Sequence, residues 1–150
     1  MTAAISAGAS RVPLTARWLG ALGALPFFAC ALASTVLDGG LQVEAMVALT
    51  AYGAVILSFL GGIQWGLAIA AGGGQFRRLS VSILPALFAW GGLLLQPGTG
   101  ALVIAAVLAC VLLVDIKASR NQEAPTWYPK LRWPLTVAAA SALLLGATLG

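Results

Sequence analysis

Long apolar runs separated by short polar connections constrain this chain more than any other feature of its sequence. The runs cover about 18–37, 45–71, 79–95, 100–116 and 133–149. A helix needs about 20 predominantly apolar residues to cross the hydrocarbon layer of a bilayer. Since 61% of the residues are hydrophobic and only 8% are charged, a soluble globule of this composition would lack a polar surface. The runs predict an all-α fold, an integral membrane bundle of five transmembrane helices forming a single domain over residues 1–150.

The connection between the third and fourth runs is the Pro- and Gly-containing segment "QPGTG", residues 96–100. A connection this short joins neighbouring antiparallel helices. We expect the third and fourth spans to pack side by side as a helical hairpin.

The basic residues all fall on connections that the five-span arrangement places on one side of the membrane. They are Arg11 and Arg17, then Arg77 and Arg78, then Lys117, Arg120, Lys130 and Arg132. The two connections on the opposite side contain no Lys or Arg. They are residues 38–44, which begin with "DGG" and end at Glu44, and "QPGTG" at 96–100. Because positively charged connections stay in the cytoplasm, we predict a cytoplasmic N-terminus with a tail over residues 1–17, and a C-terminus outside.

Two alternatives concern the first apolar run. It follows Arg17 and ends in "ALAS", which also fits a cleaved signal peptide, and the acid-free start of the chain fits a weak organelle-targeting sequence. Phe27 and Phe28 directly before Cys30 do not suit a lipoprotein site. We expect a retained first span and a location in the bacterial inner membrane, with the mitochondrial inner membrane as the alternative.

The second run carries a stripe of small residues. Ser58, Gly62 and Gly66 fall on one helical face, which Ala51, Val55 and Ala70 extend. Small side chains let helix backbones approach closely in lipid, where apolar contact alone gives no hydrophobic gain. We expect this face to pack inside the bundle, and homodimerisation through it is the alternative.

Gln64 projects from nearly the opposite side of the same helix. An amide facing lipid would leave its donors and acceptor unpaired, so we expect Gln64 to be buried and the second span to be the central helix. Pro85 frees the carbonyl of Val81 in the third span, which Gln64 could reach. A serine or a water molecule satisfying that carbonyl is the alternative.

Asp115 is the only carboxylate within an apolar run. Because Lys117 and Arg120 follow at the end of that run, we expect an interfacial ion pair. The alternative is a functional carboxylate, such as a proton-coupled site, because intramembrane acids are often functional.

The segment "NQEAPTWYPKLRWP", residues 121–134, mixes aromatic and basic residues before the fifth span. Such residues suit the headgroup layer. The predicted interfacial anchors are Trp127, Tyr128, Lys130, Arg132 and Trp133, and Pro134 would lie in the first turn of the fifth helix. A docking site for another protein is the alternative.

No catalytic, metal-binding or cofactor-binding pattern is present in the sequence. There is no histidine, and Cys30 and Cys110 lie in apolar runs where a thiol behaves as a small hydrophobe. The net charge of +4 is explained by membrane orientation, so we expect no nucleic-acid partner. We expect no cofactor, and an enzyme is the least favoured class.

Three segments carry a resemblance to a known family. The stretches "AYGAVILSFLGGIQWGLA" (51–68), "SVSILPALFAWGGLLL" (80–95) and "APTWYPKLRWPLT" (124–136) resemble the transmembrane protein 69-like family of bacteria and mitochondria. The likeness runs from about Trp18 to the fifth span. The resemblance implies a small multi-span membrane protein without an assigned activity, and it implies no catalytic residues.

Two functions follow from these patterns. The first is a structural or assembly factor of a membrane complex, with the lipid bilayer and other membrane proteins or a second copy as partners. The second is a protein that binds or transports a small molecule or lipid. Its pocket would lie between spans two, three and four and would be lined by Tyr52, Gln64, Trp65, Pro85, Trp90 and Asp115.

Overall fold

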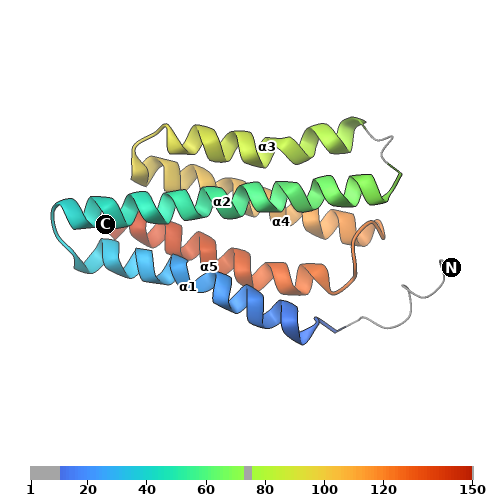
Figure 1. The fold of residues 1–150 in the computed structure, drawn as a ribbon, viewed down its shortest axis with the longest axis horizontal. Coiled ribbons are helices and arrows are strands. Elements are labelled where there is room, and N and C mark those ends of the chain that lie inside the picture. The colour runs from blue at the N-terminus through green and yellow to red at the C-terminus, as the bar shows by residue number, and fades with distance from the viewer. Residues whose placement is uncertain (1–10, 73–75, 150) are drawn as a thin grey trace.

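The computed structural model describes residues 11–72 and 76–149, which form five α-helices and no strand (Figure 1). The helices are α1 Leu14–Val36, α2 Gly40–Ala70, α3 Phe76–Leu93, α4 Pro97–Arg120 and α5 Tyr128–Leu149. Each begins before the apolar run that predicts it, because the polar end turns of a helix carry no hydropathy signal. The predicted all-α class is confirmed. Residues 1–10 of the expected N-terminal tail lie outside the described residues.

Four of these helices, α1, α2, α4 and α5, are long and apolar enough to cross a membrane. α3 is not among them, because its 18 residues include Arg77 and Arg78 in the first turn and two serines beyond it. The described residues therefore contain four candidate membrane spans, one fewer than the five predicted. The side of the membrane on which each end lies remains a prediction.

The helices alternate in direction along the bundle (Figure 1). The starts of α1, α3 and α5 lie at the same end as the finishes of α2 and α4. α2 contacts each of the other four helices, and α3 packs against its chain neighbours α2 and α4. The central position of α2 and the hairpin of α3 and α4 are both as predicted. All the basic residues of the described helices thus lie near one end, which we name the basic end.

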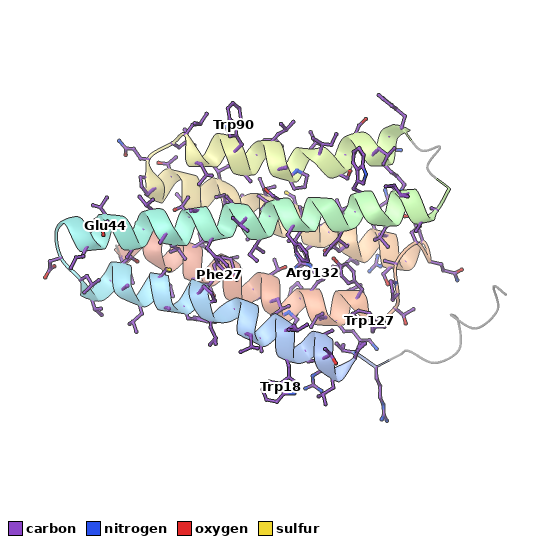
Figure 2. All side chains as sticks on the ribbon, viewed as in Figure 1. Trp18, Phe27, Glu44, Trp90, Trp127 and Arg132 are labelled. Atoms are coloured by element: carbon purple, nitrogen blue, oxygen red, sulfur yellow. The ribbon has the colours of Figure 1, made fainter. Side chains whose placement is uncertain are left out.

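The interior and the outer surface of the bundle are both apolar. Leu57 of α2, Leu108 of α4 and Leu143 of α5 are fully buried in one core. Many large apolar side chains instead project outward, including Trp18 and Trp90, which are labelled in Figure 2. An apolar outer surface of this extent suits contact with lipid, since soluble monomers rarely expose large apolar patches.

Close packing of α2 depends on Gly61 rather than on the predicted stripe. A Cβ added to Gly61 would lie 2.6 Å from the carbonyl oxygen of Ser82 in α3, whereas one added to Gly62 or Gly66 would meet no atom within 4 Å. Ser58, Gly62 and Gly66 all lie on the exposed side of α2. The expectation that this stripe packs inside the bundle is wrong, because the face that carries Gly61 and Gln64 turns inward instead. Its alternative, packing against a second copy, stays a prediction.

Gly61→Ala tests the close approach of α2 and α3, and Gly62→Ala is the matched control one position along the same helix. Because the added methyl group would press on backbone, we expect Gly61→Ala to lower the free energy of unfolding by about 1–3 kcal/mol. Gly62→Ala should be near neutral. Thermal unfolding of the two variants in one detergent measures the difference, and equal stabilities would contradict the packing described.

Candidate functional site

Three polar side chains from three helices meet inside the bundle. They are Gln64 of α2, Asp115 of α4 and Arg132 of α5. Arg132 Nε donates a hydrogen bond to Asp115 Oδ2 at 2.9 Å, and Gln64 Nε2 donates one to Asp115 Oδ1. Asp115 is 0% exposed and Arg132 is 6% exposed. Each carboxylate oxygen therefore has a donor, and we name the three residues the polar cluster.

The composition of the polar cluster follows from the cost of burying charge. An isolated carboxylate in an apolar interior is strongly unfavourable, and an ion pair offsets that cost only when its geometry is good and its remaining lone pairs are satisfied. Arg132 supplies the opposite charge and Gln64 supplies a neutral donor. The cluster therefore ties α2, α4 and α5 to one another through a single carboxylate.

The partners of Asp115 differ from those predicted. Lys117 and Arg120 are exposed, and the ion pair is made with Arg132. A helix turns about 100° per residue, so residues two and five positions after Asp115 point away from its face. The expected interfacial pair is wrong for this geometric reason, and Asp115 lies in the interior.

Gln64 is partly buried, as expected, but its partner is the carboxylate of Asp115 and not the Val81 carbonyl. The nearby Ser82 hydroxyl donates to the carbonyl of Leu79 at 2.7 Å within α3. Pro85 is buried, and its ring lies close to Gly61. Gln64 and Pro85 thus lie on the same side of the bundle, between α2 and α3.

Residues 121–134, which the sequence predicts to lie at the membrane interface, are partly helical. α5 begins at Tyr128, so Tyr128 and Arg132 are one turn apart and both are buried. Arg132 reaches between the helices in Figure 2, whereas Trp133 is exposed. Trp127 is half-buried, with its ring 6.2 Å from that of Tyr128.

The prediction of interfacial anchors is therefore wrong for Tyr128 and Arg132. Lys130 and Trp133 remain on the outer face of α5. Pro134 lies inside the helix rather than in its first turn. The spacing Tyr128, Arg132, Thr136 would have revealed the inward face, since positions i, i+4 and i+8 share one side of a helix.

Three residues of the predicted pocket lie elsewhere. The Tyr52 hydroxyl donates to the Gly23 carbonyl at 2.7 Å, and its ring packs against Phe27, so it faces α1. Trp65 and Trp90 are exposed on the outer surface. None of the three faces the space between α2, α3 and α4.

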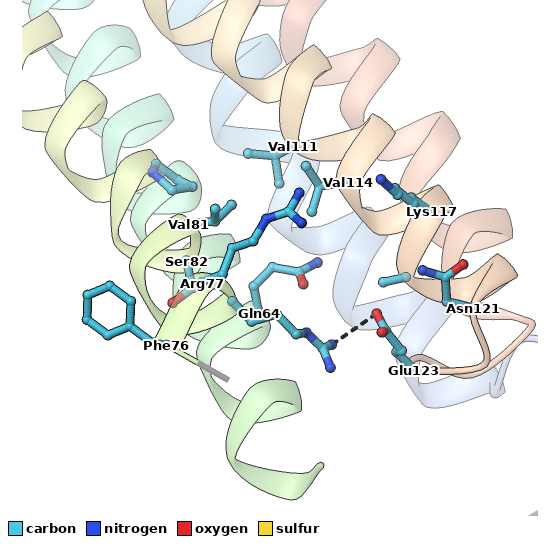
Figure 3. Close-up of a pocket in the computed structure, with 13 residues that line it drawn as sticks. Gln64, Phe76, Arg77, Val81, Ser82, Val111, Val114, Lys117, Asn121 and Glu123 are labelled. Atoms are coloured by element: carbon cyan, nitrogen blue, oxygen red, sulfur yellow. Dashed lines mark ion pairs between the residues drawn. The ribbon is translucent and has the colours of Figure 1, made fainter. Parts of the chain in front are cut away.

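A cavity of about 650 Å³ nevertheless lies between α2, α3 and α4 at the basic end (Figure 3). Figure 3 shows side chains of α3 facing those of α4 across it, with Gln64 between them. Its charged lining residues are Arg77, Arg78, Lys117 and Glu123, and its apolar wall is formed by Phe76, Val81, Pro85, Val111, Val114 and Ala118. We name it the basic cavity.

The basic cavity carries more positive than negative charge. Glu123 is the one carboxylate among its lining residues, and it pairs with Arg78 at 3.2 Å. Arg77 and Lys117 add two further cations. Within residues 11–72 and 76–149, no group of three or more His, Cys, Asp or Glu side chains could hold a metal ion. The basic cavity therefore presents cationic side chains next to an apolar wall.

These features define a multi-span helical membrane protein with a polar cluster buried between its helices, toward the basic end. The chain belongs to the family described as Protein of unknown function (DUF3429), whose model matches residues 12–148. This match confirms the family resemblance seen in the sequence.

Two of the relatives are vertebrate proteins named Transmembrane protein 69. Transmembrane protein 69 of Xenopus tropicalis is 33% identical over 135 residues, which cover 88% of this chain and 53% of that protein. Transmembrane protein 69 of Mus musculus is 26% identical over 130 residues, covering 85% of this chain and 53% of that protein. The chain spans about half the length of these relatives. No solved structure matches it.

Arg132→Met tests the energetic role of the polar cluster. This change leaves the Asp115 carboxylate buried without its counterion, so we expect the free energy of unfolding to fall by about 3–5 kcal/mol. Adding Asp115→Asn should recover most of the loss, because the asparagine side chain is neutral and its carbonyl oxygen still accepts from Gln64. Denaturant unfolding in mixed micelles measures both variants.

Glu123→Gln is the control, because it breaks the partly exposed pair with Arg78. Its cost should be less than about 1 kcal/mol. An Arg132→Met protein as stable as Glu123→Gln would show that the buried pair does not hold α4 and α5 together.

Proposed function

We propose that the protein binds an anionic lipid, or an amphiphile of the same chemistry, in the basic cavity. One observation carries this proposal: three basic side chains and an apolar wall line the same cavity of about 650 Å³. Cations attract a phosphate or carboxylate, and an apolar wall accepts an acyl chain. A volume of this size lies within the range of small-molecule sites.

The order of residues along the cavity matches the order of groups in a lipid. Arg77 and Arg78 begin α3, and Lys117 lies in the last turn of α4. Pro85 lies eight residues after Arg77, about 12 Å farther along the helix axis. An anionic headgroup at the basic end would therefore place its chain against Val81 and Pro85.

The position of α5 favours ligand binding in the basic cavity over a role in assembly. An assembly role would use residues 127–133 as an outward docking surface. Tyr128 and Arg132 are buried, so that surface is reduced to Lys130 and Trp133 with part of Trp127. No contact of the described residues specifically favours a protein partner, whereas the basic cavity supports a ligand.

We further propose that α3 is a fifth span, with the N-terminus in the cytoplasm. α2 and α4 run in the same direction, so a chain that crosses the bilayer in both must return between them. α3 makes that return beside α2 and α4. The positive-inside rule then supports a basic end facing the cytoplasm of a bacterial inner membrane, with the mitochondrial inner membrane as the alternative.

Removing two cations from the basic cavity should weaken binding of anionic lipid. A basic residue near a membrane surface contributes about 1 kcal/mol to such binding, so the double variant Arg77→Gln and Lys117→Gln should lose about 2 kcal/mol, or roughly 30-fold in affinity for phosphatidylglycerol. The matched control is Arg17→Gln and Arg120→Gln, two exposed cations that do not line the cavity.

Native mass spectrometry of the detergent-purified protein with added phosphatidylglycerol measures the bound fraction, and phosphatidylcholine serves as the uncharged comparison. Equal losses in the two double variants, or equal binding of the two lipids, would contradict the proposed site.

Thiol labelling tests the orientation. In a protein with Cys30→Ala and Cys110→Ala, we introduce either D38C in the connection from α1 to α2 or N121C at the end of α4. Both positions are exposed. A membrane-impermeant maleimide should label D38C from the outer side of the inner membrane and N121C only after that membrane is opened. The reverse pattern would overturn the orientation.

A further inference from the structure

We propose that a second cavity, on the other side of the polar cluster, binds a neutral glycerolipid through the ester and hydroxyl oxygens of its glycerol backbone. The three binding groups are Tyr128, Arg132 and Thr136 of α5. This site is separate from the basic cavity and differs from it in charge, in lining residues and in the lipid class that it would take.

The second cavity has a volume of about 310 Å³ and lies between α1, α2, α4 and α5. Its lining is mostly apolar and includes Phe27 of α1, Leu60 of α2, Leu108 of α4 and Leu135 of α5. We name it the inner cavity. Apolar walls of this kind accept hydrocarbon, and the size is near the lower end for small-molecule sites.

Three residues that line the inner cavity each carry a buried polar atom with no hydrogen-bond partner among the described residues. The residues are Tyr128, Arg132 and Thr136, and the atoms are Tyr128 Oη, Arg132 Nη2 and Thr136 Oγ1. Tyr128, Arg132 and Thr136 are 9%, 6% and 4% exposed. Buried polar groups are nearly always paired, and leaving them unpaired is costly. Three such atoms on one cavity wall point to a ligand that supplies their partners.

The three residues follow one another along one face of α5. Residues at i, i+4 and i+8 share a helical face, so their Cα atoms span about 12 Å of the helix axis. A ligand that satisfies them needs more than one oxygen atom. The ester and hydroxyl oxygens of a glycerol backbone provide such a series.

The charge balance of the inner cavity favours a neutral ligand. The Arg132 guanidinium is already paired with the Asp115 carboxylate through Nε, so the inner cavity has no uncompensated cation. Arg132 Nη2 can only donate, while the hydroxyl groups of Tyr128 and Thr136 can donate or accept. A carbonyl oxygen without formal charge is the matching acceptor.

Position and access also suit a bilayer lipid. Tyr128, Arg132 and Thr136 occupy the first turns of α5, at the basic end, where a bilayer places its ester groups between headgroups and hydrocarbon. Leu19 of α1 and Phe59 of α2 line the cavity and are also exposed on the outer surface. The cavity is thus bordered by lipid-facing residues, and a lipid would enter sideways between α1 and α2.

The test uses monoacylglycerol with a photoreactive diazirine in its acyl chain, added to the full chain in lipid nanodiscs. Saturable labelling should map to peptides that contain Phe59 or Leu131. The double variant Tyr128→Phe and Thr136→Val removes both hydroxyl groups and keeps the Asp115–Arg132 pair. Loss of two hydrogen bonds should weaken binding roughly tenfold, as measured by competition with unlabelled monoacylglycerol.

Thr148→Val is the matched control, since Thr148 lies on the same helix, is exposed and does not line the inner cavity. It should bind the probe as the unaltered protein does. The double variant should unfold at an equal or higher temperature, because the hydroxyl groups that it loses have no partner. Thr136→Val alone, with a smaller loss of binding, provides the same comparison with one change.

Three results would overturn the proposal. They are labelling that does not saturate, undiminished binding to the Tyr128→Phe and Thr136→Val variant, and stronger competition by a fatty acid of the same chain length than by the neutral glyceride. Arg77→Gln with Lys117→Gln should leave binding of the neutral probe unchanged, so failure of either proposed site is distinguishable from failure of the other.

Discussion

The rest of the structure depends on the two hydrogen bonds that the Asp115 carboxylate accepts inside the bundle. This carboxylate accepts one hydrogen bond from α2 and one from α5 while remaining fully shielded from the surface of the bundle. A charge in this position is unfavourable unless both partners stay in place. The pairing therefore sets the rotation of three helices, turning Gln64 and Arg132 inward. The same rotation leaves Gly62 and Gly66 on the outside and brings Gly61 against α3.

The polar cluster also divides the interior into two chemically different spaces. Gln64 lines the basic cavity and Arg132 lines the inner cavity, with Asp115 bonded to both residues. One space has three cations and one carboxylate among its lining residues. The other has a guanidinium paired with Asp115 and two hydroxyl groups that have no partner among the described residues. The two proposed ligands follow from this division. A lipid in either cavity would contact a residue that is hydrogen-bonded to the Asp115 carboxylate. The two cavities are therefore connected through Asp115.

Much of the architecture could be predicted from the sequence because hydropathy and charge are local signals. The apolar runs located all five helices, and "QPGTG" predicted the hairpin of α3 and α4. The site was harder to predict because its contacts join positions far apart in the chain. Asp115 and Arg132 belong to different helices, and a mixed aromatic and basic segment concealed the first turns of α5. The helical spacing of Tyr128, Arg132 and Thr136 was the available signal for the inward face of α5. The choice between Gly61 and Gly62 depends on helix rotation, which apolar periodicity alone does not determine.

A distance measurement in a bilayer tests the Asp115–Arg132 pair most directly. The chain has two aspartates, Asp38 and Asp115, and Asp38 lies in the connection from α1 to α2, away from the basic end. Solid-state NMR of protein with ¹³C-labelled Asp carboxyl carbons and ¹⁵N-labelled Arg side chains would detect proximity between the two residue types. One aspartate signal should show a carbon–nitrogen separation of about 4 Å or less, as hydrogen-bond geometry requires, and Asp115→Asn should remove that signal. Two aspartate signals that are both remote from every arginine would contradict the buried pair and the bundle arranged around it.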